Sequence, residues 1–168
     1  MHKTLLILAA ATLIAACAPP QPGMSGAPVV RYSADARFDT VRDDLHDAII
    51  ARGLVIDNTS YVAKMLDRTG KDVGSTKAIY ADGQGQAFSF CSAVLSRKTM
   101  EADPHNMVFC PYTLVVYRTA AEPGKVHVAY RRPMLPDGSE AARASLQDVE
   151  TLLDGIAREA LSLGAPAG

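Results

Sequence analysis

Two cysteines near the middle of the chain, Cys91 and Cys110, carry the most reactive side chains of the body that follows the N-terminal segment. Two such thiols can form a structural disulfide, act as a redox pair or metal ligands, or remain as separate buried thiols. Their spacing is not the C-x-x-C spacing of thioredoxin-type redox sites. The residues alone leave these alternatives open.

A group of soft metal ligands precedes the second cysteine, since His105, Met107 and Cys110 follow one another closely. Imidazole and sulfur ligands suit copper. A cupredoxin-like site needs a second histidine and a different ligand order, and His127 would join only through the fold. We therefore interpret His105 as a surface histidine and Met107 as a packed methionine, and we expect no bound cofactor. A metal site that uses these residues remains an alternative.

Other patterns of catalysis or ligand binding are weak in this sequence. No Ser-His-Asp or His-Glu spacing stands out, and no pair of carboxylates shares a predicted face. The glycines of Asp82-Gly83-Gln84-Gly85 lack the lysine and the strand-to-helix context of a phosphate-binding loop. Arg131-Arg132 is interpreted as a solvated strand end rather than an anion site, and His46 as part of a solvated helix face.

The N-terminal segment is typical of a secretion signal. Lys3 supplies a positive charge, and Leu5 to Ala16 is an apolar stretch too short to span a bilayer as a stable helix. The stretch ends in Ile14-Ala15-Ala16-Cys17, which resembles the signal of a bacterial lipoprotein. The resemblance implies removal of residues 1–16 and acylation of Cys17, which would anchor the protein in a membrane. An ordinary secretory signal or an uncleaved anchor is the alternative.

The residues after Cys17 indicate where the body is held. Ala18 follows the cysteine in place of an aspartate, which resembles a signal for the outer membrane, facing the periplasm. Residues 17–28 are rich in proline and glycine and predict a tether with a reach of about 30 Å. In an oxidising compartment, the even number of remaining thiols favours a Cys91–Cys110 disulfide over free thiols.

The composition predicts one packed domain. The chain has 168 residues, of which 48 % are hydrophobic and 21 % charged, which is enough apolar surface for a core. We place this domain at residues 29–163, before a flexible tail at residues 164–168. The net charge of −1 provides no long-range field that would attract nucleic acid.

Two amphipathic helices dominate the predicted elements, because apolar residues recur at helical spacing. The first stripe is Phe38, Val41, Leu45, Ala48 and Ile49, and the second is Ala142, Leu146, Val149, Leu152, Leu153, Ile156 and Ala160. Ser33 or Asp35 is expected to cap the first helix, and Asp137 or Ser139 the second. Shorter helices are expected after Tyr61 and after Ser92.

About five strands accompany these helices. They are expected at residues 29–33, 54–56, 86–91, 109–117 and 125–131, and a segment at 76–80 is expected to form a hairpin with residues 86–91 through the turn at 82–85. In the last strand, alternation predicts one buried face and one wet face that carries His127, Ala129 and Arg131. Together the elements predict an α+β fold in which the helices cover one face of a sheet.

The order of these elements, between roughly Phe38 and Pro133, is similar to that of the bacterial DUF302 family. The similarity rests on five short motifs: Phe90-Cys91, Ala102-Asp103-Pro104, Phe109-Cys110-Pro111, Leu114-Val115-Val116-Tyr117 and Gly124-Lys125-Val126. The family usually has Pro-Cys where this chain has Cys110-Pro111. The resemblance implies an antiparallel sheet of about 4–5 strands with two long helices on one face, like half of the TATA-binding-protein fold. It implies no settled activity.

These observations favour a lipid-anchored envelope protein with a non-enzymatic binding or accessory domain. Its partners would be a membrane, through the lipid on Cys17, and an unidentified envelope protein or small ligand. A periplasmic thiol-redox or metal-handling protein that uses Cys91 and Cys110 is the first alternative. A domain that binds a small ligand on the open face of the sheet is the second.

Overall fold

The structure, a computed structural model, describes residues 27–164. The predicted signal peptide, Cys17, most of the predicted tether and the end of the tail lie outside the described residues. The elements follow one another as β1 (Val29–Asp35), α1 (Phe38–Ile50), β2 (Val55–Ser60), α2 (Val62–Thr69), η1 (Lys71–Val73), β3 (Tyr80–Cys91), α3 (Ala93–Ala102), η2 (Pro104–Phe109), β4 (Tyr112–Thr119), β5 (Lys125–Arg131) and α4 (Glu140–Ala160).

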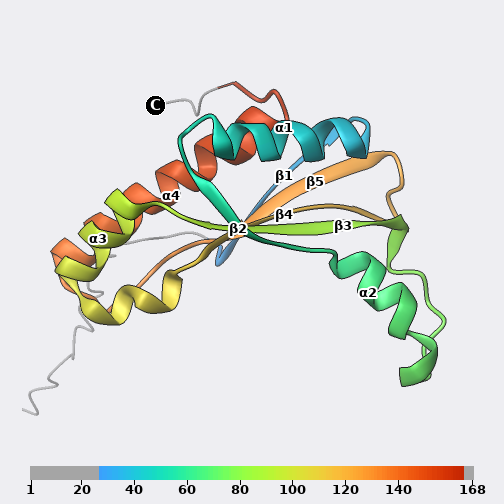
Figure 1. Ribbon diagram of the computed structural model, residues 1–168, viewed down its shortest axis with the longest axis horizontal. Coiled ribbons are helices and arrows are strands. Elements are labelled where there is room, and N and C mark those ends of the chain that lie inside the picture. Colours follow the sequence, from blue (N-terminus) through green and yellow to red (C-terminus); the bar gives the residue numbers. More distant parts are fainter. Residues whose placement is uncertain (1–26, 165–168) are drawn as a thin grey trace, which may run out of the picture.

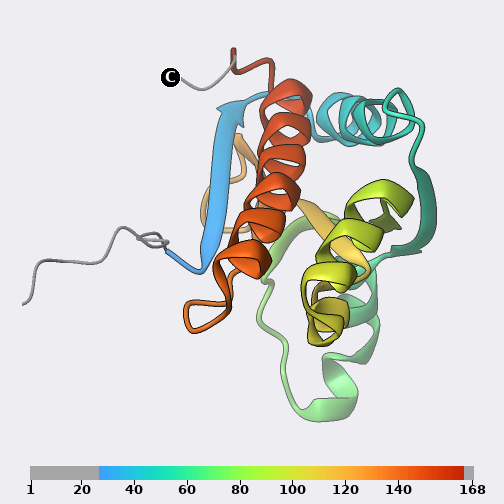
Figure 2. The ribbon, with the colours of Figure 1, turned by 90° about the vertical axis from the view of Figure 1, so that its left-hand side faces the viewer.

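The five strands form one antiparallel sheet in the order β1-β5-β4-β3-β2. The long helices α1 and α4 lie on one face of this sheet, and α3 packs against α4 (Figures 1 and 2). The prediction of an α+β fold with an antiparallel sheet and two long helices on one face is confirmed. No helix within residues 27–164 combines the length and the apolar character that crossing a bilayer requires.

The core lies between the sheet and the two long helices. All five apolar residues predicted for the first helix are buried in α1. The stripe predicted for α4 is also buried, except for Leu152, which is half-buried. The sheet contributes side chains that alternate along the three central strands: Phe88, Phe90, Tyr112, Leu114, Val116, Val126, Val128 and Tyr130. Because each helix has a single apolar stripe, it buries that stripe against the sheet and the neighbouring helix.

The helix ends follow the local sequence in most cases. The Ser139 hydroxyl accepts a hydrogen bond from the Ala142 N–H at 3.1 Å and caps α4. The Ser92 hydroxyl caps α3 in the same way, from the Leu95 N–H at 3.3 Å. The first helix differs, because its N-cap is Arg37 and makes no side-chain capping bond. Ser33 and Asp35, predicted as its caps, belong to β1 instead.

The predicted hairpin between residues 76–80 and 86–91 is wrong. β3 runs without reversal from Tyr80 to Cys91. Asp82 and Gly83 have positive φ angles of 51° and 64°, and the pairing with β4 shifts register between Tyr80 and Gly85. An Asp-Gly pair suits a hairpin turn, but here its left-handed backbone accommodates an irregularity within one long strand.

The start of β4 also differs from the prediction. The predicted strand at 109–117 begins only at Tyr112, because Pro104–Phe109 forms the 3-10 helix η2. Asp103 caps this short helix by accepting a hydrogen bond from the His105 N–H at 2.9 Å. Asp103, which precedes Pro104, therefore lies at the end of α3 and caps the start of η2.

The last strand has two buried faces, so the prediction of one wet face is wrong. His127 and Ala129 are 4 % and 5 % exposed, and Arg131 alone of the three predicted outward residues is exposed. β5 lies between β1 and β4 in the sheet. Side chains from both neighbouring strands therefore shield it, which alternation along a single strand cannot reveal.

Candidate functional site

The structure brings Cys91 and Cys110 together at one end of the sheet. Cys91 is the last residue of β3, and Cys110 lies between η2 and β4, joined to Pro111 by a cis peptide bond. The antiparallel pairing of Phe90 with Tyr112 sets the two strand ends side by side. The two Sγ atoms are 2.8 Å apart, whereas a covalent S–S bond measures about 2.05 Å.

Helix α3 covers this pair of thiols, which we call the thiol pair. The Ser96 hydroxyl lies 3.4 Å from the Cys110 Sγ atom and 3.2 Å from the Tyr112 hydroxyl. Burial, reinforced by the neighbouring Cys110 thiol, raises the pKa of Cys91 to about 12. A reactive catalytic thiol needs the opposite shift, toward a thiolate at neutral pH. The Cys91 thiol is therefore held protonated at neutral pH, and it contacts the sulfur of Cys110.

The residues proposed as alternative metal ligands are arranged differently. Met107 is 68 % exposed rather than packed, and His105 is exposed on η2. The Cys110 sulfur contacts Cys91 and Ser96. Within residues 27–164, no three side chains among His, Cys, Asp and Glu come together where they could hold one metal ion.

A polar cluster around His127 of β5 was missed by the sequence analysis. The Ser33 hydroxyl lies 2.7 Å from the Nδ1 atom of His127, and the Tyr117 ring stacks on the imidazole with centroids 5.0 Å apart. A carboxylate oxygen of Glu122 lies 3.7 Å from the Nε2 atom. Ser33 and His127 are 94 residues apart in the chain and meet only because β1 pairs with β5. No local spacing could have revealed this.

The polar cluster is a structural link rather than an open catalytic site. The His127 side chain is enclosed by β1, β4 and the turn that carries Glu122, which leaves a substrate little access to the ring. Burial lowers the pKa of His127, and the positive charges of Arg31 and Lys125 act in the same direction, while Glu122 opposes them. The imidazole is therefore held neutral in the folded state.

The lowered pKa of His127 makes the stability of the protein depend on pH. The unfolded chain takes up a proton at this residue near pH 6.5, while the folded protein resists protonation. We expect the contribution of His127 to the free energy of unfolding to be fully present above that pH and to be lost as the pH is lowered from 7 toward 5. His127→Gln should flatten this slope in urea titrations at several pH values. Equal slopes for the wild type and His127→Gln would contradict the assignment.

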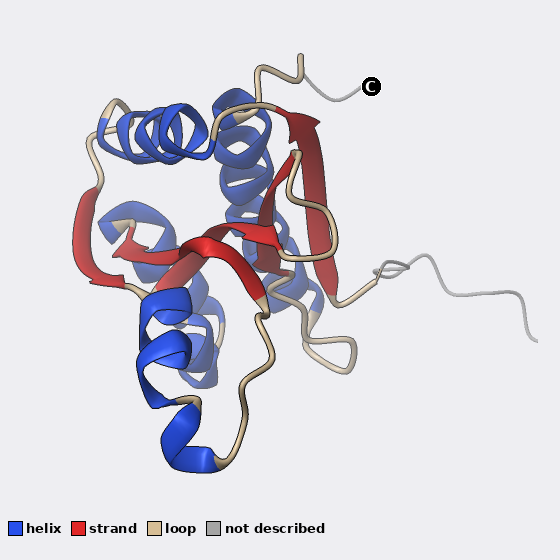
Figure 3. Ribbon diagram, turned by 90° about the vertical axis from the view of Figure 1, so that its right-hand side faces the viewer, coloured by secondary structure: helices blue, strands red, loops and turns tan. Residues whose placement is uncertain are grey.

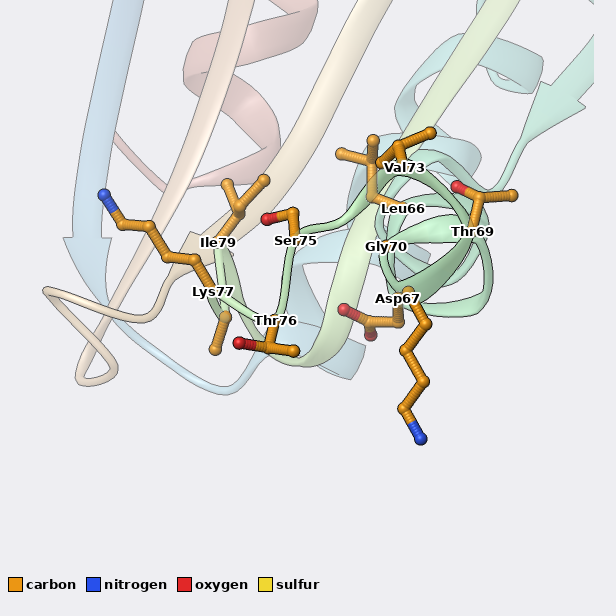
Figure 4. A pocket seen from close by; sticks show the side chains of 11 residues that line it. Leu66, Asp67, Thr69, Gly70, Val73, Ser75, Thr76, Lys77 and Ile79 are labelled. Carbon is orange, nitrogen blue, oxygen red and sulfur yellow. The ribbon is translucent and has the colours of Figure 1, made fainter.

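The helix α2 protrudes from the sheet and frames a cavity of about 310 Å³ (Figures 3 and 4). Ala63 anchors α2 by packing closely against Gly85 of β3. A Cβ atom added at Gly85 would lie 3.0 Å from the Cβ atom of Ala63. The cavity lies between α2 with η1 on one side and residues 75–79 on the other. Its lining includes the apolar side chains of Leu66, Val73 and Ile79 and the carboxylate of Asp67.

The lining of the α2 cavity is suited to holding a small molecule. Apolar walls with a few polar and charged side chains, here including Asp67, Lys71 and Lys77, can hold and orient a small molecule. Gly70 and Ser75 close the cavity by a backbone hydrogen bond of 2.8 Å, and the space beside Gly70 is too small for a Cβ atom. The sequence analysis expected residues 76–80 to form one arm of a hairpin and predicted no site here.

Comparison with known proteins places the fold among previously observed ones. Residues 30–160 match the family model described as "Domain of unknown function DUF302". A similar solved structure is described as an uncharacterized conserved DUF302 protein from Bacillus stearothermophilus. It is 14 % identical in sequence, has a TM-score of 0.65, and the match covers 80 % of this chain and 99 % of that one. No curated protein matches this chain.

Proposed function

Because the chain belongs to the DUF302 family, a domain of unknown function, we propose its function from its own residues. The protein is a lipid-anchored component of the bacterial envelope, held at the outer membrane and facing the periplasm. Its folded domain is a binding or accessory domain that recognises an envelope protein or a small ligand. The observation that carries the proposal is the motif Ile14-Ala15-Ala16-Cys17, which precedes both the family match and β1.

The character of the side chains supports binding rather than catalysis. The raised pKa of Cys91 disfavours a nucleophilic thiolate. The His127 ring is enclosed, and the α2 cavity has mainly apolar walls. These features suit a domain that recognises a partner.

In this proposal, export to an oxidising compartment converts the thiol pair into a structural disulfide. The two thiols lose two protons and two electrons to a disulfide-carrying oxidant protein of the periplasm, and a Cys91–Cys110 disulfide forms. The Sγ distance of 2.8 Å means that only a small shift is needed. The disulfide would join β3 to β4 beside α3 and would persist in an oxidising space.

Cys17→Ala tests the anchor. We expect this variant to be lost from the membrane fraction and to incorporate no labelled palmitate, because it has no thiol to acylate. Its fold should be unchanged, since the described domain begins after residue 26. Ala18→Ser, which keeps the cysteine, is the control and should remain membrane-bound. A Cys17→Ala product that stays with membranes after a high-salt wash would remove the basis of the proposal.

A redox function is the second candidate, favoured by the direct contact of the two sulfurs and by their partial exposure. The two candidates differ in the reduction potential of the thiol pair. A structural disulfide resists mild reductant, whereas a catalytic one exchanges readily with glutathione. Equilibration of the purified mature protein in glutathione buffers, followed by thiol alkylation, separates them.

A further inference from the structure

A second cavity, of about 290 Å³, lies at the end of the sheet where β1 begins. In Figure 2, the start of β1 and the loop that leads from β5 to α4 lie together at this end. We call it the Pro28 cavity. Its lining combines apolar residues from η2 and the β5–α4 loop with two arginines: Pro28, Val108, Phe109, Pro111, Tyr112, Thr113, Arg131, Arg132, Pro133, Met134 and Leu153.

The two arginines of this cavity differ in whether a carboxylate of the protein pairs with their charge. The Arg132 Nε atom lies 3.1 Å from a carboxylate oxygen of the buried Glu150, so its charge is largely used within the protein. Arg131 is exposed, and no carboxylate in residues 27–164 lies within ion-pair distance of it. Arg131 is therefore available to an external anion.

Apolar side chains that face solvent surround the same cavity. Val108 lines it and is 79 % exposed. Val29, which pairs with Arg131 across the sheet, is 51 % exposed, and Met107 adjoins Val108 on η2. Exposed apolar side chains can enter the interface of a bilayer, and a single exposed arginine near an anionic surface adds about 1 kcal/mol of attraction.

The chain itself connects this end to the proposed anchor. Pro28 lines the cavity, and Cys17 precedes it by eleven residues. A fully extended chain of that length spans at most about 40 Å. The Pro28 cavity is therefore the part of the domain that reaches the bilayer with the least extension, while α2 lies at the opposite end of the long axis from α3 (Figure 1).

We propose that the Pro28 cavity and the exposed side chains of Val29, Met107 and Val108 form a membrane-facing surface that binds an anionic phospholipid headgroup. This inference rests on the proposed lipid anchor. Arg131 donates hydrogen bonds to the headgroup phosphate, and the apolar side chains enter the interface. The acyl anchor raises the local concentration of headgroups, so a weak contact is enough to orient the domain. In that orientation the α2 cavity faces away from the bilayer.

The test uses the mature polypeptide with Cys17→Ser, so that no acyl chain contributes. The family relative, whose chain is almost wholly covered by the match, indicates that the domain folds without the preceding segment. Vesicles of phosphatidylcholine mixed with phosphatidylglycerol are compared with pure phosphatidylcholine in a sedimentation assay. We expect binding to the anionic vesicles only, and release by salt.

Arg131→Gln should lower the partition onto anionic vesicles about five-fold, the factor that one arginine contributes near such a surface. Val108→Ser should lower it as well, with the thermal midpoint of both variants unchanged. Arg97→Gln is the control, because Arg97 is also exposed but lies on α3 in an ion pair with Glu101. Equal binding to both kinds of vesicle, or equal loss with Arg97→Gln, overturns the membrane-facing surface. Because these proteins lack the anchor, that result would leave the Cys17→Ala experiment unaffected.

Discussion

Ile156→Asp should leave the domain unfolded at room temperature. Ile156 is fully buried in α4 and belongs to the cluster that joins the helices to the sheet. An aspartate there places a carboxylate in an apolar site with no partner, at a cost of several kcal/mol against a total stability of about 5–15 kcal/mol. Leu146→Asp, also fully buried, should act in the same way. Circular dichroism at room temperature and a thermal scan provide the measurement.

The control for this prediction is Gln147→Asp, an exposed position on the same helix. It adds the same carboxylate without burying it, so its thermal midpoint should lie close to that of the wild type. A soluble Ile156→Asp protein with an unchanged midpoint would mean that α4 does not pack on the sheet as the structure has it.

Cys91→Ser should lower the free energy of unfolding of the exported protein by about 2–4 kcal/mol. The effect follows from the proposed disulfide, which would close a loop containing α3 and η2 and so restrict the unfolded chain. Urea titrations of the wild type with and without reductant should differ by the same amount. Exported mature protein should show no free thiol after unfolding.

The control for the thiol prediction is the double variant Cys91→Ser with Cys110→Ser. It should match the single variant closely, because either change alone removes the bond, and reductant should affect neither. Two titratable thiols per unfolded chain, with no effect of reductant on wild-type stability, would identify Cys91 and Cys110 as separate thiols.

The helices could be predicted from the sequence because the information that defines them is local. The stripe from Phe38 to Ile49 and the one from Ala142 to Ala160 repeat every three or four residues, and only a helix places such residues on one side. The caps Ser92 and Ser139 also act on N–H groups three residues away. Both the stripes and the caps can be recognised in the sequence without knowledge of the tertiary structure.

The errors concern residues whose environment is set by distant parts of the chain. Asp82-Gly83 has the same local preference in a hairpin turn and in a strand irregularity, and only pairing with β4 decides between them. Serine is a residue type that often caps helices, but the hydroxyl of Ser33 hydrogen-bonds His127 of β5 instead. The burial of His127 and Ala129 depends on strands β1 and β4, which alternation within β5 does not report.

The features of the candidate site also divide into those that local sequence determines and those that distant parts of the chain determine. The approach of Cys91 and Cys110 could be predicted, because a short helical segment between two antiparallel strand ends brings those ends together. The cluster of Ser33, His127 and Glu122 could not, since it depends on strand order. The α2 cavity depends on the path of residues 75–79, which have no periodic pattern.

The position of β1 has a consequence for the time at which the protein can fold. β1 is the first strand to leave a ribosome or a secretion pore, yet its partner in the sheet is β5, the last strand. β2, which follows soon after, must likewise wait for β3. The emerging chain therefore cannot complete its sheet until most of its length is outside. Until then the chain carries an unpaired strand edge, which is a site where a second chain can add by strand pairing.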